Sequence, residues 1–96
     1  MTPSTILDLN RGQIREAVSR YKVANPRVFG SVLHGTDSEA SDLDLLVDAL
    51  PGASLMDVCG LQVELEDLLG VRVDVLTPAD LSPRFRAQVL AEAQPV

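Results

Sequence analysis

The chain is poor in the residues that build disulfides, zinc sites and aromatic clusters. Its 96 residues include one cysteine, Cys59, one histidine, His34, and only 3% aromatic side chains. One cysteine permits no internal disulfide, and one histidine excludes a histidine-based zinc cluster. The core must therefore be built from Leu, Val, Ile and Ala, and Cys59 is predicted to be a small buried hydrophobic residue.

Positive charge and long apolar runs are also scarce. Eight Lys and Arg against fourteen Asp and Glu give a net charge of −6. Because nucleic-acid-binding proteins neutralise phosphates with clustered Lys and Arg, we do not expect nucleic acid as the main partner. No apolar run reaches the roughly 18 residues of a membrane span, and no signal peptide opens the chain. We expect a soluble cytoplasmic protein without membrane contact, made of one domain over residues 1–96.

Apolar periodicity predicts helices alternating with short strands. The predicted elements, in chain order, are a helix over 5–21, a strand over 27–29, a strand over 42–47, a helix over 55–69, a strand over 71–76 and a helix from 83 to about 93. Thr5 with Asp8 resembles a cap of the first helix, but Asn10 could equally cap a later start. Gly70 is the predicted end of the helix over 55–69. On that helix, Met56 and Val63 lie off the main apolar stripe, which is consistent with either a wide core face or a partner contact.

The stretch from Phe29 to Val47 carries the strongest functional signal. It contains Gly30-Ser31 and, after ten residues, the pair Asp42 and Asp44. Strand alternation places both aspartates on one face of the second strand. Magnesium accepts one or two protein carboxylates and completes its octahedron with phosphate oxygens and water. The pair therefore suits the two metal ions, roughly 3.5–4 Å apart, that serve nucleotidyl transfer.

Asp74 is the predicted third carboxylate. It stands alone in a Val-rich strand, where an unpartnered buried carboxylate is costly. Facing the same cleft, Asp74 would bind the metal beside the acceptor hydroxyl and help to remove its proton. The structural alternative is an Asp paired with Arg72 or exposed at a sheet edge.

Gly30 and Ser31 are the predicted nucleotide-binding turn. Glycine permits close approach to a phosphate, whose oxygens can accept from turn amides and from the serine hydroxyl. Gly35 is predicted to close this turn, and Ser41 to orient the loop before the aspartates. Gly-Ser alone is common; its specificity comes from its occurrence with the aspartate pair at this spacing.

These motifs resemble the polymerase-beta-type nucleotidyltransferases. The short length and the run from Val73 to Pro78 resemble, more narrowly, the minimal nucleotidyltransferases. The resemblance implies an α+β, two-layer fold with a mixed sheet of three or four strands and about four helices. It also implies Gly30 and Ser31 at the triphosphate, with Asp42, Asp44 and Asp74 at Mg²⁺.

Similar family members are antitoxins encoded beside a HEPN ribonuclease toxin. The resemblance therefore implies transfer of AMP from ATP to a tyrosine of such a toxin, within a hetero-oligomer. Two alternatives remain: neutralisation by binding alone, and transfer to a small molecule, for which the chain leaves little room.

The chain departs from the family around the Gly-Ser turn. Family members commonly carry arginines where this chain has Val32, Leu33 and His34. Either His34, Arg27 or Arg72 supplies the missing positive charge, or activity is low.

Overall fold

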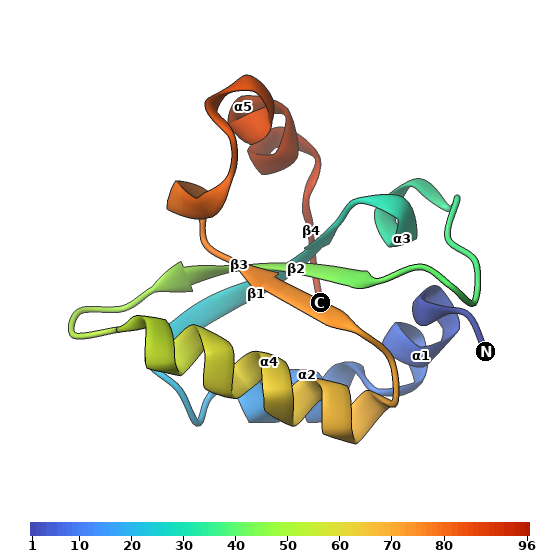
Figure 1. Ribbon diagram of the computed structural model, residues 1–96, viewed down its shortest axis with the longest axis horizontal. Coiled ribbons are helices and arrows are strands. Elements are labelled where there is room, and N and C mark those ends of the chain that lie inside the picture. Colours follow the sequence, from blue (N-terminus) through green and yellow to red (C-terminus); the bar gives the residue numbers. More distant parts are fainter.

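The computed structural model describes all 96 residues and shows a four-stranded mixed sheet with helices on both faces (Figure 1). The strand order is β3-β2-β1-β4; β1 is antiparallel to β2 and β4, and β2 is parallel to β3. The α+β prediction is confirmed. The elements are α1 (Pro3–Leu9), α2 (Arg11–Val18), β1 (Val23–Phe29), α3 (Ser31–His34), β2 (Leu43–Ala49), α4 (Leu55–Leu69), β3 (Val73–Leu76), the 3₁₀ turn η1 (Pro78–Asp80), α5 (Pro83–Glu92) and β4 (Gln94–Pro95).

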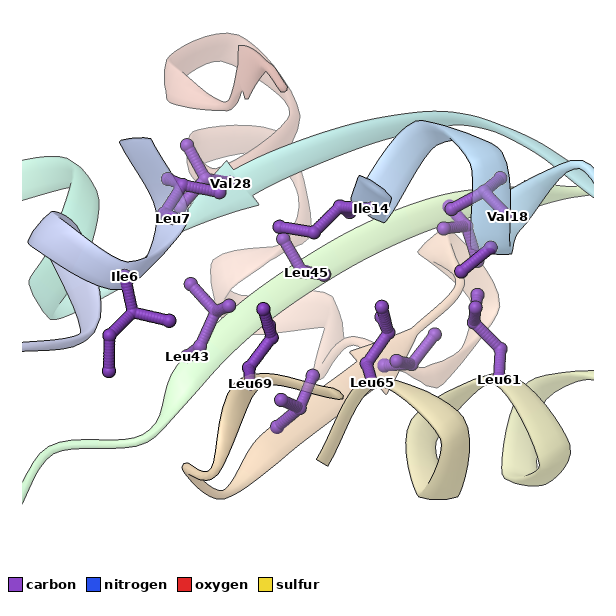
Figure 2. Close-up of a cluster of buried hydrophobic side chains, with 14 of the residues drawn as sticks. Ile6, Leu7, Ile14, Val18, Val28, Leu43, Leu45, Leu61, Leu65 and Leu69 are labelled. Atoms are coloured by element: carbon purple, nitrogen blue, oxygen red, sulfur yellow. The ribbon is translucent and has the colours of Figure 1, made fainter. Parts of the chain in front are cut away.

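The main core lies between the sheet and the layer formed by α2 and α4 (Figure 1). It is a cluster of 16 buried residues, all aliphatic, as the composition requires. Each buried Leu, Ile or Val contributes roughly 1.5–3 kcal/mol of hydrophobic stabilisation. Figure 2 shows Leu61, Leu65 and Leu69 of α4 facing Leu43 and Leu45 of β2, with Ile14 and Val18 of α2 closing the cluster.

Helix α4 begins and ends where the sequence predicts. Ser54 Oγ accepts from the Met56 backbone N–H at 3.2 Å, and Asp57 Oδ2 accepts from the Ser54 N–H at 2.9 Å. Gly70 follows the helix with φ 70°, a left-handed conformation that glycine adopts without strain. Local capping and the apolar stripe point to the same helix, which explains why its bounds could be predicted.

The outer face of α4 corrects two predictions. Met56 is 80% exposed and Val63 is 57% exposed, so the wide core-face interpretation is wrong. Cys59 is exposed as well, contrary to its predicted burial. The core-facing stripe of α4 is already supplied by its leucines, which leaves these three side chains in solvent.

The N-terminal segment is two helices, so the single helix predicted over 5–21 is wrong. Asn10 separates α1 from α2 with φ −129° and ψ 19°, and its side-chain amide donates to the carbonyl of Ile6 at 2.8 Å. This local bond satisfies the end of α1 and turns the chain. Strand β1 then starts at Val23, before the predicted position, because a register irregularity between Ala24 and Arg27 accommodates Pro26.

Strand β3 forms one edge of the sheet, and its outward amides are satisfied by α4. Glu66 Oε2 accepts from the Val73 N–H and Gln62 Oε1 from the Val75 N–H, both at 3.2 Å. After η1, helix α5 begins with Pro83 behind the Ser82 cap, as predicted, and no residue of α5 is buried. None of the helices combines the length and apolar character that crossing a membrane requires.

Candidate active site

The sheet register brings two of the predicted carboxylates together. Asp44 of β2 is paired with Asp74 of β3, and on its other side with Phe29 of β1. Paired residues of adjacent strands share a face, so Asp44 and Asp74 lie side by side on the face opposite the main core. Asp42 comes just before β2, two residues from Asp44. The three aspartates are therefore gathered at the N-terminal ends of two parallel strands. Asp74 is exposed on the edge strand β3, so its predicted burial is wrong and the exposed sheet-edge position is the one observed.

Gly30 packs directly against Asp44. It follows β1 with φ 76° and ψ −149°, a backbone region that is essentially restricted to glycine. A Cβ placed on Gly30 would lie 3.2 Å from Cγ of Asp44 and would clash with its Oδ2. The glycine thus gives the carboxylate room, and helix α3 follows it directly in the chain.

Crowding and burial shift the titration of Asp44. Burial, together with the negative charges of Asp74 and Asp42, raises the pKa of this carboxyl from 3.8 to about 6. Each neighbouring negative charge disfavours the ionised form, which a bound cation would favour. The site is therefore arranged to prefer either a proton or a positive ion at Asp44.

Asp42 has an oxygen that the protein does not satisfy. Its Oδ1 is buried and accepts no hydrogen bond, although Nε of Arg72 lies 3.1 Å away. The separation is that of an ion pair, but the N–H is not directed at the oxygen, so the contact is one of charge only. A buried acceptor without a donor is unfavourable, and a hard cation is a ligand that such an oxygen suits.

The carboxylates do not form a complete metal cage. No three His, Cys, Asp or Glu side chains converge tightly enough to hold an ion by themselves. Mg²⁺ does not need such a cage, because it keeps water and phosphate oxygens in most of its coordination sites. The orphaned oxygen of Asp42 and the crowding around Asp44 fit a metal that arrives with a phosphate ligand.

The remaining predicted site residues shape the two adjoining loops. Ser31 is the first residue of α3, a short helix that the sequence did not predict, and Gly35 ends it with φ 70°. Ser41 Oγ accepts from the Ser38 N–H at 2.9 Å, which fixes the loop that leads to Asp42.

Of the three side chains that could replace the family arginines, His34, Arg27 and Arg72, the first two form ion pairs with acids outside the carboxylate site. Arg27 Nη2 lies 2.5 Å from Asp48 Oδ1. His34 Nε2 lies 2.9 Å from Glu92 Oε2, which links α3 to the end of α5. Glu92 was missed at the sequence level, because nothing in its surroundings in the chain marks it as a neighbour of the turn.

The surface near the carboxylates has no enclosed pocket. A polar hollow of about 370 Å³ borders Asp42, lined by the loop before it and by the residues from Gly70 to Arg72. Neither Asp44 nor Asp74 lines any of the three hollows of the molecule. The carboxylate pair therefore opens onto a broad face, without a cavity for a small acceptor.

A mixed sheet with three aspartates at the ends of parallel strands, facing a Gly-Ser turn, defines a nucleotidyltransferase-type site. The nucleotidyltransferase domain family model matches residues 11–96. The chain belongs to this family.

Relatives of the chain carry more specific names. It is 38% identical over 88 residues to the protein adenylyltransferase MntA of Thermococcus cleftensis, covering 92% of this chain and 86% of that protein. A solved structure provisionally described as a minimal nucleotidyltransferase is 44% identical and matches with a TM-score of 0.85, covering 97% of this chain and 95% of the other.

A toxin–antitoxin structure solved with AMP-PNP has a TM-score of 0.75 over 90% of this chain and 71% of the matched chain. Its identity is 24%, so this likeness concerns the fold.

Proposed function

We propose that the chain is a protein adenylyltransferase that acts as an antitoxin, transferring AMP from ATP to a tyrosine hydroxyl of a HEPN ribonuclease toxin. The observation that carries this proposal is the register that sets Asp44 beside Asp74 with Gly30 packed against it. The relative named protein adenylyltransferase MntA supports the acceptor class, since it is similar over most of both chains.

In this proposal each predicted residue has a distinct role. The backbone amides after Gly30 and the hydroxyl of Ser31 bind phosphate oxygens, while Gly35 and Ser41 hold the flanking loops. Asp42, Asp44 and Asp74 would hold Mg²⁺. Bound there, Mg²⁺ would stabilise negative charge on the phosphate oxygens.

The transfer itself exchanges one phosphorus–oxygen bond for another. The tyrosine oxygen forms a bond to the α-phosphorus, the bond from that phosphorus to the pyrophosphate oxygen breaks, and pyrophosphate leaves with the electron pair. Asp74 accepts the tyrosine proton, which makes the attacking oxygen more nucleophilic. Asp44 must be ionised for its part, and its pKa of about 6 makes that the prevailing form at neutral pH.

An open face beside the carboxylates suits an acceptor presented by another protein. Small-molecule transfer needs a pocket for the acceptor, and no hollow reaches Asp74. A partner that brings its own tyrosine needs only access to this face, in a complex of the two proteins.

The test is co-expression of this chain with a HEPN ribonuclease toxin. The intact mass of the toxin should rise by one or more AMP units, and Asp44→Asn should slow this modification by at least about a hundred-fold, as expected for loss of one charge-stabilising group. Asp48→Asn is the matched control, because Asp48 lies on the same strand but pairs with Arg27. A toxin that is inhibited without any mass increase would contradict the proposal.

Neutralisation by binding alone is the second candidate. It is favoured by Val32 and Leu33 at positions where arginines are common, and by the engagement of Arg27 and His34 with other acids. Isothermal titration with ATP and Mg²⁺ separates the two candidates. Absence of nucleotide binding, together with toxin inhibition that survives Asp44→Asn, would establish the second.

A further inference from the structure

Arg72 is the one cation beside the carboxylates that the protein does not hold in place. Its Nε lies 3.1 Å from Oδ1 of Asp42, yet its side chain is 79% exposed. By contrast, Arg27 is 14% exposed and donates both to Asp48 and to the carbonyl of Asn25. Arg27 is therefore fixed, whereas Arg72 can leave its partner without breaking any other contact.

Arg72 compensates the charge of Asp42 but leaves its hydrogen-bonding capacity unfilled. Oδ1 is buried and accepts no hydrogen bond, despite the nearby guanidinium. A divalent cation at this oxygen would supply both the charge and a directed ligand bond. The same cation would repel the guanidinium, because two positive charges would then share one carboxylate oxygen.

We propose that Arg72 is the counterion of Asp42 in the metal-free protein and is released from it when a divalent cation binds. This inference rests on the proposed function, in which Asp42 holds the metal. Arg72 is thus a positioning residue and a competitor: it neutralises the carboxylate before loading and must be displaced during loading. The exchange is possible because the side chain of Arg72 makes no other ion pair or hydrogen bond, while its backbone is held just before β3, where its carbonyl accepts from the Leu43 N–H.

The direct test is the affinity of the full chain for Mn²⁺ alone, measured by titration calorimetry at pH 7.5 and 0.15 M salt. Arg72→Gln removes the competing charge and should bind Mn²⁺ about two- to five-fold more tightly, the range that loss of an exposed ion pair allows. Arg72→Lys keeps a positive charge and should stay closer to the wild type.

Arg20→Gln is the matched charge control. Arg20 pairs with Glu16 and Glu64 on the helical layer, so its loss changes net charge equally without touching Asp42. Screening over about 8 Å at this salt should leave its Mn²⁺ affinity unchanged. In the Asp42→Asn background, Arg72→Gln should have no further effect on Mn²⁺ affinity, because the competition requires the carboxylate.

Thermal unfolding with EDTA and with Mn²⁺ provides a second readout. The gain in melting temperature on adding Mn²⁺ should be larger for Arg72→Gln than for the wild type. Unchanged or weaker Mn²⁺ binding by Arg72→Gln, with binding still abolished by Asp42→Asn, would overturn this inference alone. Absence of Mn²⁺ binding by the wild type and by Arg72→Gln would overturn the metal-site proposal as well.

Discussion

The surroundings of Asp44 disfavour the ionised form of its carboxyl group. It is partly buried and stands beside Asp74 and near Asp42, and its pKa is raised to about 6. A carboxyl with a raised pKa in the folded state stabilises that state while it is protonated. This stabilisation is fully present below the unfolded pKa of 3.8 and is lost as the pH rises through about 6.

Asp44→Asn should therefore stabilise the metal-free protein at pH 7.5 while removing activity. Asn resembles the neutral carboxyl, so the free energy of unfolding should increase by about 1–2 kcal/mol, less than the full shift converts to, because the side chain is partly solvated. At pH 4 the gain should largely disappear. Denaturant unfolding in EDTA at both pH values measures the change in the free energy of unfolding. A variant that is less stable than the wild type at pH 7.5 would contradict the prediction.

Asp48→Asn gives the opposite expectation in the same measurement. Asp48 accepts from Arg27 and Asn25, so its charge is paired. Loss of this negative charge should reduce the free energy of unfolding at pH 7.5. The comparison therefore separates the effect of the crowded carboxylates around Asp44 from the effect of removing any carboxylate from the strand.

Gly30→Ala should be more harmful than Gly35→Ala, although both glycines have positive φ. A Cβ at Gly35 meets nothing within 4 Å, so only backbone strain of about 1–2 kcal/mol is expected there. At Gly30 the methyl would also clash with Asp44, which should add at least about 1 kcal/mol. Urea unfolding of both variants measures the difference, and equal losses would show that the clash is relieved at no cost.

The aspartates could be predicted from the sequence because their placement follows from strand periodicity. Alternation places Asp44 and Asp74 on one face wherever their strands pair. Arg72 pairs with Asp42 and not with Asp74, and this choice depends on side-chain rotamers and on where β2 begins. The link from His34 to Glu92 depends on how α5 folds back over the sheet. Neither is encoded in local spacing.

At the scale of elements, helix α4 stabilises strand β3 both by apolar packing and by hydrogen bonds. One face of the helix fills the core, and two polar side chains, Gln62 and Glu66, accept from the edge amides of Val75 and Val73. Without them, these amides would stay half-buried and unsatisfied, because no further strand lies beyond β3.

Glu66→Ala should lower the free energy of unfolding by about 1–2 kcal/mol, the range for leaving a partly buried donor without its acceptor. Glu66→Gln keeps an acceptor oxygen and should recover most of the loss. Asp67→Ala, on the exposed side of the same helix, should stay within about 0.5 kcal/mol of the wild type. Chemical denaturation compares the three, and equal effects of Glu66→Ala and Asp67→Ala would show that the edge bond contributes nothing.

Elements with agreeing local signals were predictable, whereas elements defined by tertiary contacts were not. Helix α4 has a cap, an apolar stripe and a glycine stop. Strand β4 is a two-residue pairing with β1, and α3 is a single turn after Gly30. Such elements are too short for any periodicity to appear. Asn10 was predicted only as an alternative start of the first helix, and the separate helix α1 before it was not predicted, because apolar periodicity continues across Asn10.

At the scale of the molecule, the two faces of the sheet are unequally covered. One face packs against α2 and α4 and holds the main core, and α3 and α5 lie on the other side of the sheet (Figure 1). Asp44 and Asp74 are on this second face. Helix α5 contributes no buried residue, and Phe85 on it is 55% exposed. The layer above the site is therefore held by polar contacts such as those of Arg86 with the carbonyls of Pro78 and Leu81.

Native-state hydrogen exchange should reveal this asymmetry. Amides of α5 should exchange through local opening, at rates insensitive to low denaturant, because few apolar contacts hold this helix. Amides in the middle of α4 should exchange only through global unfolding, which makes them the internal control. Equal protection of the two helices would show that α5 is as firmly anchored as the core.

Both edges of the sheet are partly protected against pairing with a further β-strand. Exposed edge strands recruit chains in extended conformation, whether from a partner or from a misfolded neighbour. Here side chains from α4 occupy the β3 margin, and the other margin ends in a two-residue strand containing Pro95, which cannot donate a hydrogen bond. Strand addition is thereby disfavoured along β3 and at β4, which lowers the tendency of copies of this chain to pair edge to edge.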